Sequence, residues 1–144
     1  TMQEGKPTPV TTDDLFANKK VVVFAVPGAF TPTCSMAHLP GYVVHSDAIK
    51  AKGVDSIVCL SVNDAFVMGA WGDNANAEEL LMVGDGNGDF TQALGLVMDG
   101  SGFGLGKRSQ RYAMMVDNGT VTKLAVEAQG KLEVSAEEAI LEAL

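Results

Sequence analysis

Residues 20–41 have the sequence KVVVFAVPGAFTPTCSMAHLPG, and this stretch carries the pattern from which the fold class can be inferred. Lys20–Val26 is a continuous run of mainly β-branched apolar residues, which is typical of a strand buried on both faces. The run ends at Pro27-Gly28, and Thr31-Pro32 then indicates a helix N-cap followed by proline at the first helical position. The stretch therefore predicts a buried strand, a short stiff loop and the start of a helix.

The rest of the chain alternates between further strand and helix patterns. The helix is expected to continue to Lys52, with a kink at Pro40-Gly41. Asn118-Gly119 is the strongest hairpin signal in the chain, and Ser135 with Glu138 fits a capping box that would start the last helix. The remaining predicted elements are a strand over 54–62, a helix capped by Asn63 or Asp64, a helical turn over 90–96, strands over 111–116 and 120–126, and a last helix ending at Leu144.

This order of elements predicts an α/β protein. We expect a central mixed β-sheet flanked by helices on both faces, with a thioredoxin-like fold as the leading topology. No internal repeat, low-complexity tract or long linker divides the 144 residues. A single domain over residues 1–144 is therefore expected.

Composition limits the classes of function. Hydrophobic residues make up 47% of the chain, so a sizeable core is expected and a disordered chain is not. Ten basic against eighteen acidic residues give a net charge of −8, which disfavours a nucleic-acid groove or an anionic-membrane patch. No apolar run approaches the ~20 residues of a membrane span, and the first residues lack the regions of a signal peptide. We expect a soluble, cytoplasmic protein without nucleic-acid or membrane partners, with organelle import after transit-peptide removal left open.

Three motifs that would imply a cofactor or a metal fail when their spacing is checked. Residues 85–89 begin like an EF-hand loop, but Phe90 stands where the turn needs glycine and Leu96 where it needs glutamate. The segment GSGFGLGK over 100–107 resembles a phosphate-binding loop only in composition, because Arg108 stands where a Ser or Thr belongs. Two cysteines and two histidines show no zinc-like spacing. We therefore expect neither metal nor cofactor.

Cys34 is the residue of the chain with the strongest indication of chemistry. It falls in the first turn of the predicted helix, where unpaired N–H groups and the positive end of the helix dipole favour a thiolate over a thiol. Thr31 can contribute a hydroxyl within the same turn, and Pro27 with Pro32 would stiffen the loop. The alternative is that Cys34 is a small buried apolar residue, which is the usual role of a lone cysteine.

The residues PGAFTPTCSMAHLPGY resemble the peroxidatic loop of the peroxiredoxins, whose core pattern is Pro-x-x-x-Thr/Ser-x-x-Cys and corresponds here to Pro27, Thr31 and Cys34. The form PGAFTPxCS…HLPG is similar to the type II, or peroxiredoxin five, branch. The likeness runs through KGVDSIVCLSVNDAFVMGAWG and RSQRYAMMVDNGTV to the C-terminus, so it covers nearly the whole chain. The resemblance implies a homodimeric thiol peroxidase with a thioredoxin fold, and the conserved arginine of the family matches Arg111.

These implied roles agree with the chemistry of the residues. A Cys34 thiolate would attack one oxygen of hydrogen peroxide or an alkyl hydroperoxide and become a sulfenic acid. The guanidinium of Arg111 would stabilise the charge that develops on the leaving oxygen, and Thr31 would hold the peroxide in line. His38, one turn after Cys34, is an accessory candidate, although a histidine on a helix is more often simply packed. Phe30 and Leu39 are expected to line an apolar mouth, while Lys107, Arg108 and His45 are expected at the surface.

Cys59 is the candidate for a resolving cysteine. It lies 25 residues after Cys34, a spacing similar to that of plant-type members, where the equivalent residue is discussed in this role. Its setting, IVCLSV, instead indicates a structural residue buried in mid-strand, and Val134 stands where animal members carry a resolving cysteine. We therefore expect an external thiol to reduce the sulfenic acid, namely glutathione with glutaredoxin, or thioredoxin. The alternative function is a peroxide-sensing redox switch or chaperone in which oxidation of Cys34 controls binding.

Overall fold

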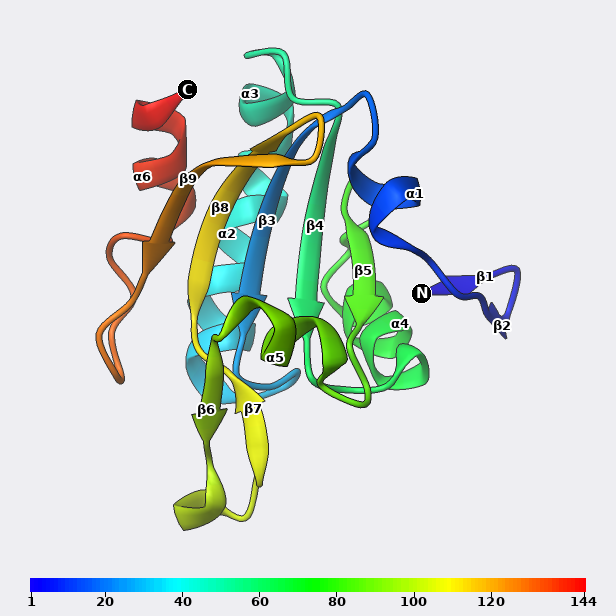
Figure 1. Cartoon of the computed structure of the whole chain (residues 1–144), viewed down its shortest axis with the longest axis vertical. Coiled ribbons are helices and arrows are strands. Elements are labelled where there is room, and N and C mark those ends of the chain that lie inside the picture. The colour runs from blue at the N-terminus through cyan, green and yellow to red at the C-terminus, as the bar shows by residue number, and fades with distance from the viewer.

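A five-stranded mixed sheet forms the centre of the molecule, as the sequence predicts (Figure 1). The computed structural model describes all residues, 1–144. The strand order is β5-β4-β3-β8-β9, in which β3 lies parallel to β4 and β4 parallel to β5, while β8 and β9 run antiparallel to their neighbours. The strands are β3 (Lys20–Val26), β4 (Ser56–Ser61), β5 (Leu81–Gly84), β8 (Tyr112–Asp117) and β9 (Thr120–Val126).

Helices cover both faces of the sheet and create two apolar cores (Figure 1). Successive residues of β3 point to opposite faces. Phe24 packs with the helices of one face, and Val23 packs with those of the other. The first face carries α2 (Leu39–Val44), α3 (Ser46–Lys50), α4 (Ala65–Asn74) and α6 (Glu137–Ala143), and the second carries α1 (Thr12–Phe16) and α5 (Asp89–Leu94). Because β3 is covered on both faces, its continuous apolar run is explained.

Two small hairpins lie outside the main sheet. β1 (Met2–Gln3) and β2 (Lys6–Pro7) pair next to α4, and the Thr1 hydroxyl donates to the Met82 carbonyl on β5. The glycine-rich segment forms β6 (Val97–Asp99), the 3₁₀ turn η2 (Ser101–Phe103) and β7 (Lys107–Ser109), which extend below the sheet in Figure 1. Neither hairpin was assigned from the sequence, because strands of two or three residues leave almost no periodicity to detect.

The helix predicted from Thr31 to Lys52 is divided into three pieces, so its single kink at Pro40-Gly41 is wrong in detail. The first piece is a π-helix, η1 (Cys34–His38), in which the Leu39 N–H donates to the Cys34 carbonyl five residues earlier. Pro40 has no N–H with which to restore the usual α-helical hydrogen bonds. A second break follows at His45, where φ is −99° and ψ is 9°. The irregularity therefore begins at Cys34 itself.

The predicted capping box at the last helix is also wrong. Ala136 is the N-cap of α6 and makes no side-chain cap. The Ser135 hydroxyl instead donates to the Glu127 carboxylate, 2.7 Å away, so a partner just beyond the end of β9 displaces the local partner Glu138. Tertiary contact overrides a local sequence pattern at this position.

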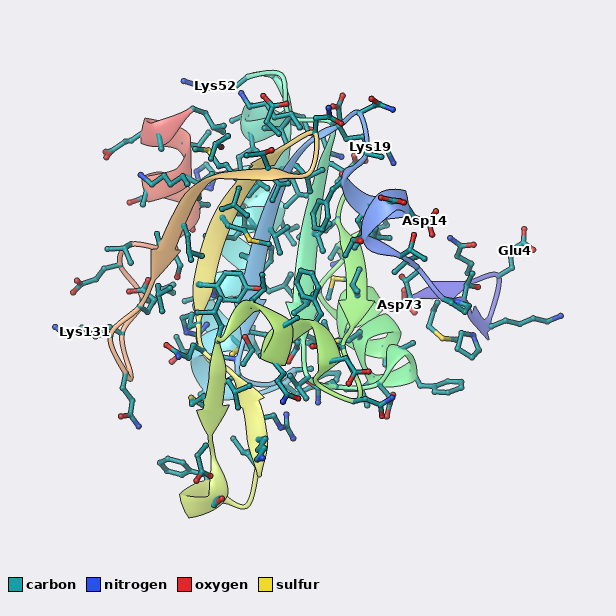
Figure 2. The ribbon with its side chains drawn as sticks, viewed as in Figure 1. Glu4, Asp14, Lys19, Lys52, Asp73 and Lys131 are labelled. Atoms are coloured by element: carbon teal, nitrogen blue, oxygen red, sulfur yellow. The ribbon has the colours of Figure 1, made fainter.

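Charged side chains lie on several sides of the molecule. Figure 2 shows Glu4, Asp14, Lys19, Lys52, Asp73 and Lys131 on different sides of the sheet. No helix combines the length and the apolar character that crossing a bilayer requires.

Candidate active site

Cys34 and Arg111 meet although 77 positions separate them in the chain. Cys34 is the first residue of η1, follows the loop after β3, and is fully buried. Arg111 immediately precedes β8, whose first residue pairs with Ala25 near the end of β3. The antiparallel pairing of β3 with β8 thus brings the arginine to the Cys34 loop, where its Nη2 donates to the Cys34 Sγ at 3.0 Å.

His38 lies on the other side of the same guanidinium. Nη1 of Arg111 donates to Nδ1 of His38 at 2.8 Å, and Nε2 of the ring lies 3.0 Å from the Ser135 carbonyl oxygen. The ring also packs against Phe24 and Tyr42, with centroids 4.9 and 5.5 Å away. Burial, and then the charge of Arg111, lower the pKa of His38 to about 4. The ring is therefore neutral at physiological pH.

Pro27 and Thr31 shape the loop between β3 and η1. The Thr31 hydroxyl donates to the Gly28 carbonyl at 2.7 Å, so its oxygen keeps lone pairs for an incoming donor. The Pro27 carbonyl accepts a bond from Nη1 of Arg108 at 3.3 Å, and Nε of Arg108 donates to Leu105. Arg108, expected at the surface, is instead half-buried, because its guanidinium bridges the glycine-rich hairpin and the loop.

Two further residues, Asn63 and Trp71, fix the loop, and the sequence does not assign either of them to the site. The Asn63 side-chain oxygen accepts the Ala29 N–H at 3.0 Å and the Ser61 hydroxyl at 2.7 Å. Nε1 of Trp71 donates to the Ser35 hydroxyl at 3.0 Å, which fastens η1 to α4. Asp64, one of the two residues proposed as a cap, is the N-cap of α4. Because Asp64 caps α4, the Asn63 side chain is available to bind the loop. No local sequence pattern predicts this role.

The apolar mouth expected from Phe30 and Leu39 is only half correct. Phe30 is 51% exposed, adopts a φ of 64° and lies 6.3 Å from the Trp71 ring. Leu39 does not line a mouth, because it is fully buried in the apolar core that includes Phe24 and Tyr42. His45 is half-buried, with Nδ1 3.0 Å from the Gly41 carbonyl oxygen.

Cys59 lies in the middle of β4, between Phe24 on β3 and Met82 on β5. It is fully buried and forms no disulfide with Cys34, although both belong to the same apolar core. Burial, followed by the nearby Cys34, raises the pKa of the Cys59 thiol well above its usual value. The setting in mid-strand agrees with the prediction from IVCLSV.

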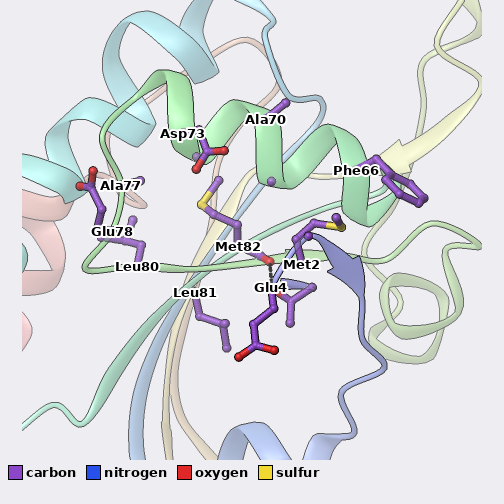
Figure 3. A pocket seen from close by; sticks show the side chains of 14 residues that line it. Met2, Glu4, Phe66, Ala70, Asp73, Ala77, Glu78, Leu80, Leu81 and Met82 are labelled. Carbon is purple, nitrogen blue, oxygen red and sulfur yellow. Dashed lines mark hydrogen bonds between the residues drawn. The ribbon is translucent and has the colours of Figure 1, made fainter.

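A polar cavity of about 350 Å³ adjoins the site. It is lined by Pro27, Thr33, Gln110 and Arg111, by β6 and by the segment 127–131. A larger cavity of about 530 Å³ lies between the β1–β2 hairpin and α4, where Met2, Glu4, Phe66 and Asp73 line it (Figure 3). It shares no residue with the Cys34 site. No three His, Cys, Asp or Glu side chains gather as metal ligands would.

Comparison with known proteins identifies the family. The sequence matches the Redoxin family over residues 1–141. Peroxiredoxin-2C of Arabidopsis thaliana is 48% identical over 136 residues, which cover 94% of this chain and 84% of that protein. The hybrid peroxiredoxin hyPrx5 of Haemophilus influenzae is 49% identical over 127 residues, which cover 88% of this chain and 53% of that longer protein.

A solved structure confirms the thioredoxin fold. Reduced Prx3 from Vibrio vulnificus, in complex with H₂O₂, superposes with a TM-score of 0.88 at 67% identity, over 90% of this chain and 82% of that one. Fold, site and sequence point to the same conclusion. The chain belongs to the Redoxin family and, within it, to the peroxiredoxins, which are thiol peroxidases.

Proposed function

We propose that Cys34 is the peroxidatic nucleophile, and that it reduces hydrogen peroxide and alkyl hydroperoxides. The observation that carries this proposal is the 3.0 Å contact between Nη2 of Arg111 and Sγ of Cys34 in a buried setting. The guanidinium donates a hydrogen bond to the sulfur and lies where it can stabilise charge during the reaction. The start of η1 adds the positive end of a helical segment, but its irregular geometry makes the arginine the more specific contact.

The reaction breaks the O–O bond of the peroxide. The Cys34 thiolate attacks one oxygen, an S–O bond forms, and the electron pair of the O–O bond passes to the leaving oxygen. That oxygen takes up a proton and departs as water or an alcohol, while sulfur becomes a sulfenic acid. Charge moves from sulfur to the leaving oxygen during this step, and Arg111 is placed to stabilise both ends. The Thr31 hydroxyl oxygen would accept a hydrogen bond from the peroxide and hold it in line, and Pro27 would keep the loop rigid.

An external thiol would regenerate the enzyme. Attack of such a thiol on the sulfenic acid forms a mixed disulfide and releases water, and a second thiol then restores Cys34. The burial of Cys59 in mid-strand supports this route over an internal one. The reductant would be glutathione with glutaredoxin, or thioredoxin. Two free cysteines without a disulfide are in keeping with the cytoplasmic location that we also propose.

The test is turnover of peroxide by the wild type, Cys34→Ser and Cys59→Ser with each reductant system. Cys34→Ser should abolish turnover while leaving the circular dichroism spectrum unchanged, because a hydroxyl is too weak a nucleophile. Cys59→Ser should leave glutathione- or glutaredoxin-coupled turnover nearly unchanged. Turnover of Cys34→Ser within tenfold of the wild type would remove the assignment. Stoichiometric oxidation of Cys34 without recycling would favour the redox switch instead.

A further inference from the structure

We propose that Glu127 is a positioning residue for Arg111, and that it acts through Ser135 and His38. The inference rests on the proposed role of Arg111 in stabilising the leaving oxygen. It assigns a function to the segment from Glu127 to Ser135, which loops out beyond the end of β9 before the chain returns to α6 (Figure 1).

Glu127 is a buried carboxylate with three hydrogen bonds on a single oxygen. Its Oε2 accepts the Glu133 N–H at 2.6 Å, the Ser135 N–H at 2.8 Å and the Ser135 hydroxyl at 2.7 Å, and the residue is 8% exposed. Burial raises the pKa of this carboxyl, but the hydrogen bonds from Ser135 and its neighbours outweigh burial, and the net pKa is lowered. The charged carboxylate therefore closes the segment into a fixed loop.

The backbone carbonyl of Ser135 connects this loop to the helical segments that carry His38 and Tyr42. Its carbonyl oxygen accepts the Tyr42 hydroxyl at 2.7 Å and faces Nε2 of His38 at 3.0 Å. A carbonyl can only accept, so Nε2 must carry the proton of the neutral ring. Nδ1 is then bare, and it can accept from Arg111, which can only donate. The position of Ser135 thus fixes the tautomer of His38.

Arg111 is held at both of its ends by this arrangement. The backbone N–H of Glu127 donates to the Arg111 carbonyl at 2.9 Å, and His38 holds the head of the side chain. The ion pairs of the molecule join His45 to Glu137, Lys50 to Glu79 and Lys131 to Glu133, so no carboxylate pairs with Arg111 directly.

The neutrality of His38, which accepts a hydrogen bond from Arg111, has a chemical consequence. A carboxylate in direct contact with the guanidinium would compete with the thiolate and with the developing charge on the leaving oxygen. His38 orients Arg111 without neutralising it, while the charge of Glu127 is engaged in three hydrogen bonds within its own loop. The negative charge of Glu127 thus holds the loop, while the positive charge of Arg111 remains available to the sulfur and to the leaving oxygen.

The test is a double-mutant cycle between Glu127 and Arg111. The readout is the second-order rate constant for oxidation of Cys34 by hydrogen peroxide, followed by the fluorescence of Trp71, the only tryptophan, which contacts Ser35 beside Cys34. Misplacing a catalytic group by about 1 Å can cost 10²-fold, and we expect a loss of about this size in Glu127→Ala. Glu127→Gln keeps an acceptor oxygen but not the charge, and should lose only about threefold to tenfold. The matched control, Glu133→Ala, removes an exposed carboxylate from the same loop and should change the rate less than twofold.

The Arg111→Ala background separates positioning from general destabilisation. If Glu127 acts through Arg111, Glu127→Ala should cause no further loss in that background. An undiminished loss there, or a Glu127→Ala rate equal to that of Glu133→Ala, would overturn the inference. If Glu127→Ala does not fold, the same cycle with Glu127→Gln decides: a loss of threefold or more that disappears with Arg111→Ala supports the inference, and any other result overturns it. A wild type that peroxide does not oxidise, or Arg111→Ala with an unchanged rate, would instead refute the proposed function.

Discussion

At the scale of single residues, Arg111 donates to two acceptors that would behave differently during the proposed reaction. His38 Nδ1, 2.8 Å from Nη1, keeps the same lone pair throughout. In the proposed reaction Cys34 Sγ, 3.0 Å from Nη2, would lose its negative charge as the leaving oxygen gains it. Nη1 of Arg111 would therefore keep an unchanged partner, while the partner of Nη2 would change its charge. A planar guanidinium provides this division, whereas an ammonium group is a single point charge.

Arg111→Lys should consequently behave as a severe change. We expect the rate constant for oxidation by hydrogen peroxide to fall by about 10²–10³, the usual cost of losing one preorganised electrostatic contact. Lys107→Ala, which removes an exposed cation from the neighbouring β7, is the matched control and should retain the wild-type rate. Stopped-flow fluorescence checks both variants. An Arg111→Lys variant that reacts as fast as the control would show that the fork geometry is irrelevant.

His38 also predicts how stability depends on pH. Its pKa is about 4 in the folded protein and 6.5 in the unfolded chain, so the unfolded chain binds more protons between these values. Its contribution is complete above pH 6.5 and is lost as the pH falls toward 4. From this residue the free energy of unfolding should drop by about 2 kcal/mol between pH 7 and pH 5.

Urea unfolding at several pH values measures this dependence. The slope should flatten in His38→Gln and persist in Asn74→Gln, which changes an exposed residue that does not titrate. Equal slopes in the two variants would contradict the neutral, buried state of His38.

At the scale of elements, the active-site turn is held by side chains from neighbouring segments. The π-helix η1 cannot be stabilised by regular hydrogen bonds alone, since Pro40 lacks an N–H. Asn63 after β4 and Trp71 on α4 supply the missing support through Ala29 and Ser35. The geometry around Cys34 is therefore set by contacts at a distance in the chain.

Asn63→Ala should test this support. Removing this acceptor leaves the Ala29 N–H without its partner, at a cost of about 1–3 kcal/mol, while the Ser61 hydroxyl keeps the Val26 carbonyl as an acceptor. The thermal midpoint should fall, and the peroxide rate should fall with it. Asn74→Ala, at the exposed end of α4, is the control and should change neither quantity. An Asn63→Ala protein with unaltered stability would exclude a supporting role.

The sequence predicts the elements that obey local rules and misses those decided by distant contacts. The apolar run of β3, the Asn118-Gly119 turn and the Thr31-Pro32 helix start were all identified, because each depends on its own residues. The capping box at Ser135 was wrong, because Glu127 competes for the hydroxyl. The expectations for Arg108 and Leu39 are wrong for a similar reason, because the residues that they contact lie on other elements.

At the scale of the whole molecule, the site is assembled from three segments that are far apart in the chain. Two of these segments can be recognised in the sequence, one from the motif around Cys34 and the other from the match of Arg111 to the conserved arginine of the family. The third, from Glu127 to Ser135, carries only the capping-box pattern at Ser135, which does not indicate a role in the site. Only the folded structure brings the Ser135 carbonyl to His38. Pairing of β3 with β8 and of β8 with β9 is what brings all three together.

Exposed apolar side chains beside the site predict that two copies associate. Phe30 is 51% exposed and Phe66 is 61% exposed, on the loop and on the adjoining α4. We expect sedimentation velocity to show a dimer of the 15.0 kDa chain. Phe66→Lys should shift the dimer toward the monomer, and Val121→Lys, on the far edge strand, should not. A wild type that remains monomeric at high micromolar concentration in both redox states would contradict this expectation.

The most direct test of the central claim is to identify the sulfur that peroxide oxidises first. The reduced protein is mixed with one equivalent of hydrogen peroxide in the presence of dimedone, which traps sulfenic acid, and its peptides are mapped by mass spectrometry. The account predicts a dimedone adduct on the Cys34 peptide and an unmodified Cys59 peptide, since only Cys34 contacts a guanidinium. An adduct on Cys59, or a dominant Cys34–Cys59 disulfide in place of the Cys34 adduct, would contradict it.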